Sequence, residues 1–315
     1  MKTSIGVDVG GTGIKAVILK KDGSVVAKRE IPTPPRFTPR ECAYVLKELI
    51  RGLAAQSREE RCIVEGIGIG LPGLIDRKRG IVRYLVNIEG WRDVPLVSML
   101  ERDLKKNMHI DNDVNAMCLG QLLFGQGRRY RNFLCVTLGT GVGGALVFHK
   151  RLYRGSTGSA GEIGHMKLVT GGRHCNCGAD GCLEAYIGNA RIAARARRLF
   201  RSRRATPSRY TAGSTPALED ITAAARKGDP LAKGIWEDVA LYLGTTLANI
   251  INLLDLEAVI VGGGVANAGG VLFNPLRRVI QEKTMRQKNR KVAILRAMLG
   301  KYAGAIGAGA LTWEE

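Results

Sequence analysis

Two stretches of this chain share one pattern, in which an apolar strand, a glycine-rich turn and a second apolar strand follow each other. The first stretch covers residues 5–19 and turns at Gly10-Gly11-Thr12-Gly13, and the second covers residues 134–148 and turns at residues 139–144. Glycine adopts the backbone angles that such tight reversals need. The repeat predicts a duplicated domain with a cleft between two similar halves.

Strands alternate with helices along the chain, which is typical of an α/β fold. One helix entry is well marked, because Thr38, Pro39 and Glu41 form a capping box with a proline in the first turn. Residues 303–311 are so small and apolar that we expect a tightly packed helix there. The other predicted elements are strands at 67–71, 108–110 and 258–261 and helices at 96–104 and 236–254.

The glycine turns are candidates for phosphate binding. Residues 139–144 match the dinucleotide fingerprint formally, but residues 145–148 are strand-like, whereas that fingerprint needs a helix after its glycines. As a pair, the two turns offer backbone N–H groups to an anion, together with two hydroxyls and one cation. The contributing residues are Gly10, Gly11, Thr12, Lys15, Gly139, Thr140 and Gly141, with Gly262, Gly263 and Gly264 as a nucleotide-base or ribose contact. Tight hairpins that bind nothing are the alternative.

Acidic residues stand at two strand ends. Asp8 precedes the first glycine turn, where an ionised carboxylate could orient a metal-bound water, or simply cap its own turn. Asp111, Asn112 and Asp113 lead from a strand into an apolar helix, and one Asp or Asn would serve as the N-cap of that helix. Three polar residues exceed that need, so a carboxylate here is a candidate general base.

A cluster of possible metal ligands lies near the middle of the chain. His165, Cys175, Cys177 and Cys182 form a Cys3His set, which is a standard set for a closed tetrahedral zinc site. Gly178 lies inside it, where a chain that turns around an ion needs backbone freedom. Glu162 and Glu184 flank these ligands, so a bound metal would hold two carboxylates in place as well. Buried or disulfide-bonded cysteines are the alternative.

Composition limits the class of protein. The 315 residues fit two domains, and the start of the chain and the lack of a long apolar run favour a cytoplasmic protein. Seven cysteines, four of them scattered in apolar segments, fit a reducing compartment. The net charge is +20, and the densest basic stretch is residues 191–209. We interpret this segment as a solvated basic helix and loop, with weak attraction to polyanions as the alternative, because no DNA-reading motif precedes the first strand.

With these residues the chain resembles the ROK-family sugar kinases (repressor, open reading frame and kinase), which lie within the actin-like ATPase and hexokinase superfamily. The resemblance covers essentially the whole chain. It rests on five motifs: Asp8-x-Gly10-Gly11-Thr12-x-x-Lys15, Asn112-Asp113, the second glycine turn, Gly161-Glu162-x-Gly164-His165, and Cys175-x-Cys177-Gly178-x-x-Gly181-Cys182-Leu183-Glu184.

The resemblance implies a fold of two duplicated actin-like (ribonuclease H-like) ATPase domains, at residues 1–116 and 117–300, with a helix at about 301–315 returning to the first. It makes Asp113 the catalytic base, and it makes His165 and the three cysteines zinc ligands. Hexose hydroxyls would be bound by Gly73, Asn112, Asp113, Glu162, His165 and Glu184. His174 is a neighbour of the zinc set that could compete as a ligand.

The implied activity is phosphorylation of a hexose at its 6-hydroxyl by ATP with Mg2+, in a homodimer. The segments 87–91 and 161–166 look closest to the glucokinase branch, which favours glucose. Kinases for mannose, allose, fructose or N-acetylmannosamine remain alternatives, as does a sugar-responsive transcription regulator. We expect no membrane partner and no specific nucleic acid.

Overall fold

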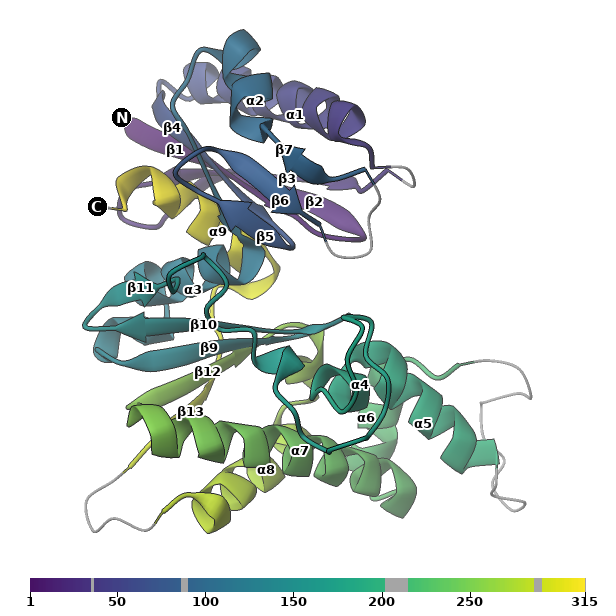
Figure 1. Ribbon diagram of the computed structural model, residues 1–315. Helices are drawn as coiled ribbons and strands as arrows, with labels where there is room; N and C mark the ends of the chain where they lie inside the picture. Colours follow the sequence, from purple (N-terminus) through teal and green to yellow (C-terminus); the bar gives the residue numbers. More distant parts are fainter. Residues whose placement is uncertain (35–36, 86–89, 202–214, 286–290, 315) are drawn as a thin grey trace. The chain divides into compact units, whose positions relative to one another are not determined.

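The computed structural model describes residues 1–34, 37–85, 90–201, 215–285 and 291–314. Within them the chain forms two compact units (Figure 1). Unit 1 contains residues 1–131, 145–160 and 297–315, and unit 2 contains residues 132–144 and 161–296. The mixture of helices and sheets confirms the predicted α/β class.

Unit 1 is organised around a five-stranded sheet of order β3-β2-β1-β4-β8. The first three strands form an antiparallel meander, and β4 and β8 add to it in parallel. The strands are β1 (Lys2–Val9), β2 (Gly13–Lys20), β3 (Val25–Pro32), β4 (Ile63–Leu71) and β8 (Met108–Asn112). Parallel neighbours place the carboxyl ends of β4 and β8 at one edge of the sheet, and β8 leads directly into α3 (Asp113–Phe124).

The two faces of this sheet are covered in different ways because successive residues of a strand point to opposite sides. Ile5 and Val7 of β1 belong to an apolar core with α1 (Pro39–Glu59) and α2 (Leu96–Leu104). The predicted capping box at the start of α1 is confirmed, since the Thr38 side chain and Glu41 bond each other's backbone N–H groups.

The other face packs against α9 (Ala303–Ala310), whose residues are all buried. Ser4 Oγ donates a hydrogen bond of 2.9 Å to the Gly309 carbonyl oxygen. An added Cβ on Gly6 would overlap the Ala305 carbonyl oxygen, and one on Gly68 would overlap that of Ala308. Backbone therefore packs on backbone, which confirms the tightly packed helix expected from the small residues of this segment.

A second sheet has the order β11-β10-β9-β12-β13, with β9 (Phe133–Leu138) parallel to β12 (Ala258–Gly262). The other strands are β10 (Val142–Phe148), β11 (Arg151–Tyr153) and β13 (Ala293–Arg296). Because β10 is a strand, the interpretation of residues 139–144 as a hairpin turn rather than a dinucleotide fingerprint is confirmed. The helices of unit 2 are α4 (Glu184–Ile187), α5 (Asn189–Arg201), α6 (Leu218–Arg226), α7 (Pro230–Leu254) and α8 (Gly270–Lys283).

The predicted helix at 236–254 begins earlier, at Pro230, because Asp229 caps two N–H groups of the first turn and proline suits that position. The sequence analysis missed the three-stranded sheet β5-β6-β7, made of β5 (Leu74–Asp76), β6 (Ile81–Tyr84) and β7 (Arg92–Val94). These strands are too short to show a period.

The compact units divide the chain differently from the expected division at residue 116. The helix α3 lies in unit 1, where Gly307 of α9 packs against the Ala116 carbonyl oxygen. The assignment of residues 1–116 and about 301–315 to one domain, and of residues 117–300 to a second, stays a prediction. Within the described ranges, no helix is both long and apolar enough to cross a bilayer.

Candidate functional site

Asp8 of β1 lies opposite Lys15 of β2, beside the first glycine turn. Its carboxylate packs against the backbone of Gly304, where no side chain fills the space. Burial raises the pKa of Asp8 to about 7, with a further contribution from the negative charge of Asp113, and Lys15 opposes the rise. The two carboxyl groups are therefore close enough to influence each other, as the expected magnesium and base residues should be.

The first glycine turn is closed by hydrogen bonds that leave its tip open. Gly10 N donates to Gly13 O at 3.1 Å, and the Thr33 hydroxyl donates to Gly10 O at 2.6 Å. Gly11 and Thr12 at the tip are exposed. Lys15 Nζ lies 3.9 Å from one carboxylate oxygen of Glu30, and Lys301 donates a hydrogen bond to the other oxygen. The sequence analysis did not identify Glu30, because a lone acid on a strand carries no motif.

Asn112 and Asp113 join β8 to α3. The Asn112 side-chain oxygen caps the helix by accepting hydrogen bonds from Val114 N at 2.9 Å and Asn115 N at 3.2 Å. Its amide donates to the carbonyl oxygen of Gly73 at 3.1 Å. Gly73 has a φ of 105°, and an added Cβ would meet the Tyr84 backbone. Asp113 Oδ1 also accepts from Val114 N at 2.9 Å, but Asn112 is the N-cap and accepts from both N–H groups.

The second glycine turn is linked to the segment of the possible zinc ligands. Gly139 N donates to Gly141 O at 2.9 Å, and Gly139 O accepts from Asn189 N at 3.0 Å. One carboxylate oxygen of Glu184 accepts a hydrogen bond of 2.9 Å from Val142 N, and the other lies 4.0 Å from Cys175 Sγ. Glu184 occupies the space that a side chain on Gly141 would need.

His165, Cys175, Cys177 and Cys182 come together as the sequence predicts. One ligand atom from each residue lies within 4.8 Å of the others, which suits a single tetrahedral ion. His165 Nδ1 lies 3.7 Å from Cys175 Sγ, so the ring faces the thiols through that nitrogen. Lys167 Nζ lies 3.2 Å from Cys182 Sγ, where its positive charge would offset that of metal-bound thiolates. The donor set fits zinc.

The neighbours of this cluster fit the same interpretation. His165 Nε2 points the other way from the thiols and lies 4.0 Å from a Glu162 carboxylate oxygen. His174 is not part of the cluster, because its exposed ring bonds to Asp180 at 3.0 Å. The four other cysteines, Cys42, Cys62, Cys118 and Cys135, are buried, as predicted for small core residues.

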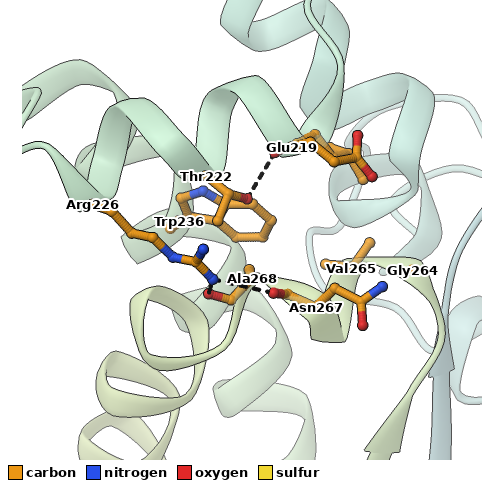
Figure 2. Close-up of a pocket in the computed structure, with 9 residues that line it drawn as sticks. Glu219, Thr222, Arg226, Trp236, Gly264, Val265, Asn267 and Ala268 are labelled. Carbon is orange, nitrogen blue, oxygen red and sulfur yellow. Dashed lines mark hydrogen bonds between the residues drawn. The ribbon is translucent and has the colours of Figure 1, made fainter. Parts of the chain in front are cut away.

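A pocket lies beside the third glycine segment, between α6, α7 and the turn after β12 (Figure 2). Gly263 has a φ of 85° and approaches the Leu138 backbone so closely that any side chain would collide. Trp236 is buried in the wall, and its indole N–H has no protein partner among the described residues. Arg226 donates to the carbonyl oxygens of Asn267 and Ala268 at 3.5 and 3.2 Å. The pocket thus offers polar and flat surfaces next to Gly264.

Two predicted segments lie partly outside the described residues. Residues 87–89 of the segment resembling glucokinases and residues 202–209 of the basic segment are not described. In the described part, Arg191, Arg197 and Arg198 of α5 are exposed, as a solvated basic helix requires, whereas Arg195 forms an ion pair with Asp238.

Comparison with known proteins gives one consistent result. The ROK family model matches residues 4–315. The glucokinase of Halalkalibacterium halodurans is 35% identical, over 99% of this chain and 95% of its own. The structure of a Streptomyces griseus ROK glucokinase in complex with glucose and AMPPNP is 33% identical, with a TM-score of 0.83 over 99% of this chain and 100% of that one. The xylose repressor of Bacillus subtilis is 28% identical over 99% of this chain and 77% of its own.

Proposed function

The chain belongs to the ROK family, and from this premise we propose that it is an ATP-dependent hexose kinase that phosphorylates the 6-hydroxyl of glucose. The observation that carries the proposal is Asp113. It stands at the start of α3 beside a helix cap supplied by Asn112, and its charge acts on Asp8 next to the first glycine turn. A full-length similarity to glucokinases supports glucose over other hexoses.

The nucleotide would be bound by groups that the fold already presents. Exposed Gly11 and Thr12 at the first turn, with Gly139, Thr140 and Gly141 at the second, would donate hydrogen bonds to the phosphates. Lys15 would add a positive charge, and the pocket beside Gly264 would take the base or ribose. Mg2+ bound to the phosphates would neutralise the charge that develops during transfer, and the Asp8 carboxylate would orient one of its waters.

The hexose hydroxyls would be bound by the residues that the family resemblance indicates, which are Gly73, Asn112, Glu162, His165 and Glu184. Asp113 would accept the proton of the 6-hydroxyl as its oxygen attacks the γ-phosphorus. Phosphoryl transfer depends mainly on positioning and charge, so fixed side chains matter more here than covalent chemistry.

Zinc would be held by His165, Cys175, Cys177 and Cys182 and would have a structural role. With its Nδ1 on the metal, His165 would present Nε2 to a sugar hydroxyl, so one ring would serve metal and substrate. The complete ligand set resembles the branch of the family that uses ATP rather than polyphosphate.

We also propose, from the family resemblance, a homodimer in the cytoplasm without a specific nucleic-acid partner. A sugar-responsive regulator is the second candidate, because the chain is 28% identical to a xylose repressor. Sequence-specific operator binding that persists at 0.2 M salt, about the range where non-specific binding is lost, would favour the regulator.

The deciding experiment is a panel of hexoses with ATP and Mg2+, followed by coupled detection of ADP. We expect glucose to give the highest kcat/KM, and turnover of mannose, allose, fructose or N-acetylmannosamine with none of glucose would contradict the choice of substrate. The matched inactive control is Asp113→Asn, which keeps the size of the side chain but cannot accept the proton. It should lower kcat by about 100-fold or more while glucose binding, measured by calorimetry, persists.

A further inference from the structure

A cluster of four charged side chains lies next to the Asn112–Asp113 segment in unit 1. Asp111 is the last residue before this segment, and Arg154, Arg77 and Glu314 approach it from distant parts of the chain. Arg154 follows β11, Arg77 follows β5, and Glu314 lies near the C-terminus. Two positive and two negative groups balance each other, and the Asp111 side chain is only 3% exposed.

Asp111 divides its two oxygens between the catalytic segment and the arginine. Oδ1 accepts hydrogen bonds from Asn112 N at 2.8 Å and from the Asn115 side-chain amide at 3.0 Å. Oδ2 accepts from Arg154 Nε at 2.7 Å and from its terminal nitrogen at 2.6 Å. The carboxylate thus connects the end of β8 and the first turn of α3 to a guanidinium on another element.

Glu314 holds the outer side of the same arginine. Its two oxygens accept from the Arg154 terminal nitrogen at 2.8 and 2.7 Å, and one also binds Arg77 at 2.8 Å. Burial by itself would lower the pKa of Arg154, but Asp111 and Glu314 outweigh burial and raise it. Arg154 therefore stays charged and has its planar group fixed from two sides, which is how arginine orients a carboxylate.

A buried carboxylate requires a fixed partner charge, and without Arg154 the Asp111 carboxylate would turn toward Arg77, whose Nε lies 3.8 Å from Oδ2. That turn would release Asn112 N and the Asn115 amide from Asp111 Oδ1. The side chain of Asn112 would keep its own bonds to Gly73, Val114 and Asn115. Loss of Arg154 should consequently disturb the backbone that carries Asp113 more than it disturbs the Asn112 side chain.

We propose that Asp111 and Arg154, with Glu314 as the outer anchor, are positioning residues that fix the orientation of Asp113. The inference rests on the proposed function, in which Asp113 accepts the hexose proton and Asn112 binds a hexose hydroxyl. A misdirected base slows the chemical step, whereas an intact Asn112 side chain preserves hexose binding. Substitutions of these positioning residues should therefore lower kcat rather than change the KM for the hexose.

The first test compares Arg154→Met with Arg154→Lys and with the control Arg83→Met. Arg83 bridges two carboxylates of unit 1 in the same manner, Asp76 and Asp93 at 2.7 Å each, but these lie on β5 and β7 rather than at the end of β8. At a temperature where all variants are folded by circular dichroism, Arg154→Met should lower kcat at least about tenfold and change the hexose KM less than about threefold. Arg154→Lys keeps the charge without the planar geometry and should be intermediate.

A double-mutant cycle separates positioning from general support of the fold. In an Asp113→Asn background, Arg154→Met should cause no further loss of the residual kcat, because residues that act as a unit are not additive. Losses that multiply would overturn the proposal. Should Arg154→Met fail to fold, Glu314→Gln takes its place, since it removes only the outer anchor and should lower kcat by a smaller factor.

The outcomes distinguish this inference from the proposed function. If wild type and Arg83→Met phosphorylate no hexose with ATP, the proposed function fails. If both are active and the folded variants at Arg154 or Glu314 match them in kcat, the positioning role is wrong while the kinase activity stands.

Discussion

At the scale of single residues, Asp8 links folding to pH. Its pKa of about 7 in the folded protein lies above the ordinary value of 3.8, so the folded state holds the proton more tightly than the unfolded chain. The contribution of Asp8 to stability should be largest below pH 4 and should fall as the pH rises to about 7, by at most about 4 kcal/mol. Asp8→Asn cannot ionise, so it should raise Tm over wild type at pH 8 and little at pH 4, without ligands. The exposed control Asp220→Asn should shift Tm little at either pH value. A shift of Tm for Asp8→Asn that is the same at pH 4 and at pH 8 would contradict the argument.

At the scale of elements, the contact between α9 and the unit 1 sheet is the most sensitive to size. An alanine Cβ at Gly68 would overlap the Ala308 carbonyl, and backbone cannot move as a side chain can. We expect Gly68→Ala to destabilise the protein by about 1–3 kcal/mol, the usual cost of overpacking. The matched control is Gly52→Ala on the exposed side of α1, where nothing lies within 4 Å of the new Cβ. Gly52→Ala should stabilise the protein by about 0.5–1 kcal/mol. If chemical denaturation shows Gly68→Ala to be the more stable of the two variants, the close packing of α9 on the sheet is refuted.

At the scale of the whole molecule, the proposed zinc ligands all belong to unit 2. The apolar cluster around Cys175 and Cys182 is small, so we expect this segment to depend on a bound metal for its stability. Removal of zinc by a chelator should lower a calorimetric transition of unit 2 and leave the transition of unit 1, which has its own core, near its original temperature. Cys175→Ser should reproduce the effect, whereas Cys62→Ser in unit 1 should leave the zinc content unchanged. Protein purified without chelator that contains no zinc by elemental analysis would refute the site.

Features set by short-range geometry could be predicted from the sequence. A capping box needs only three neighbouring residues, which is why Thr38 and Glu41 were sufficient. The thiols of Cys175, Cys177 and Cys182 are close in sequence, so few chain paths keep them apart, and they do come together with His165. The pattern of a strand, a glycine turn and a second strand was likewise sufficient to predict both hairpins.

Contacts between residues far apart in sequence were decided by the tertiary structure. Arg154 meets Asp111 across 43 positions and Glu314 across 160, and no local pattern favours either pairing. Whether the carboxylate of Asp8 is buried beside Gly304 also depends on how α9 packs on the sheet. The sequence by itself determined which groups this protein offers for the proposed binding of phosphate, sugar and metal, because turns and ligand spacings are local. Only the folded chain decided which charged side chains lie beside those groups, because burial and long-range pairing exist only after the elements have packed.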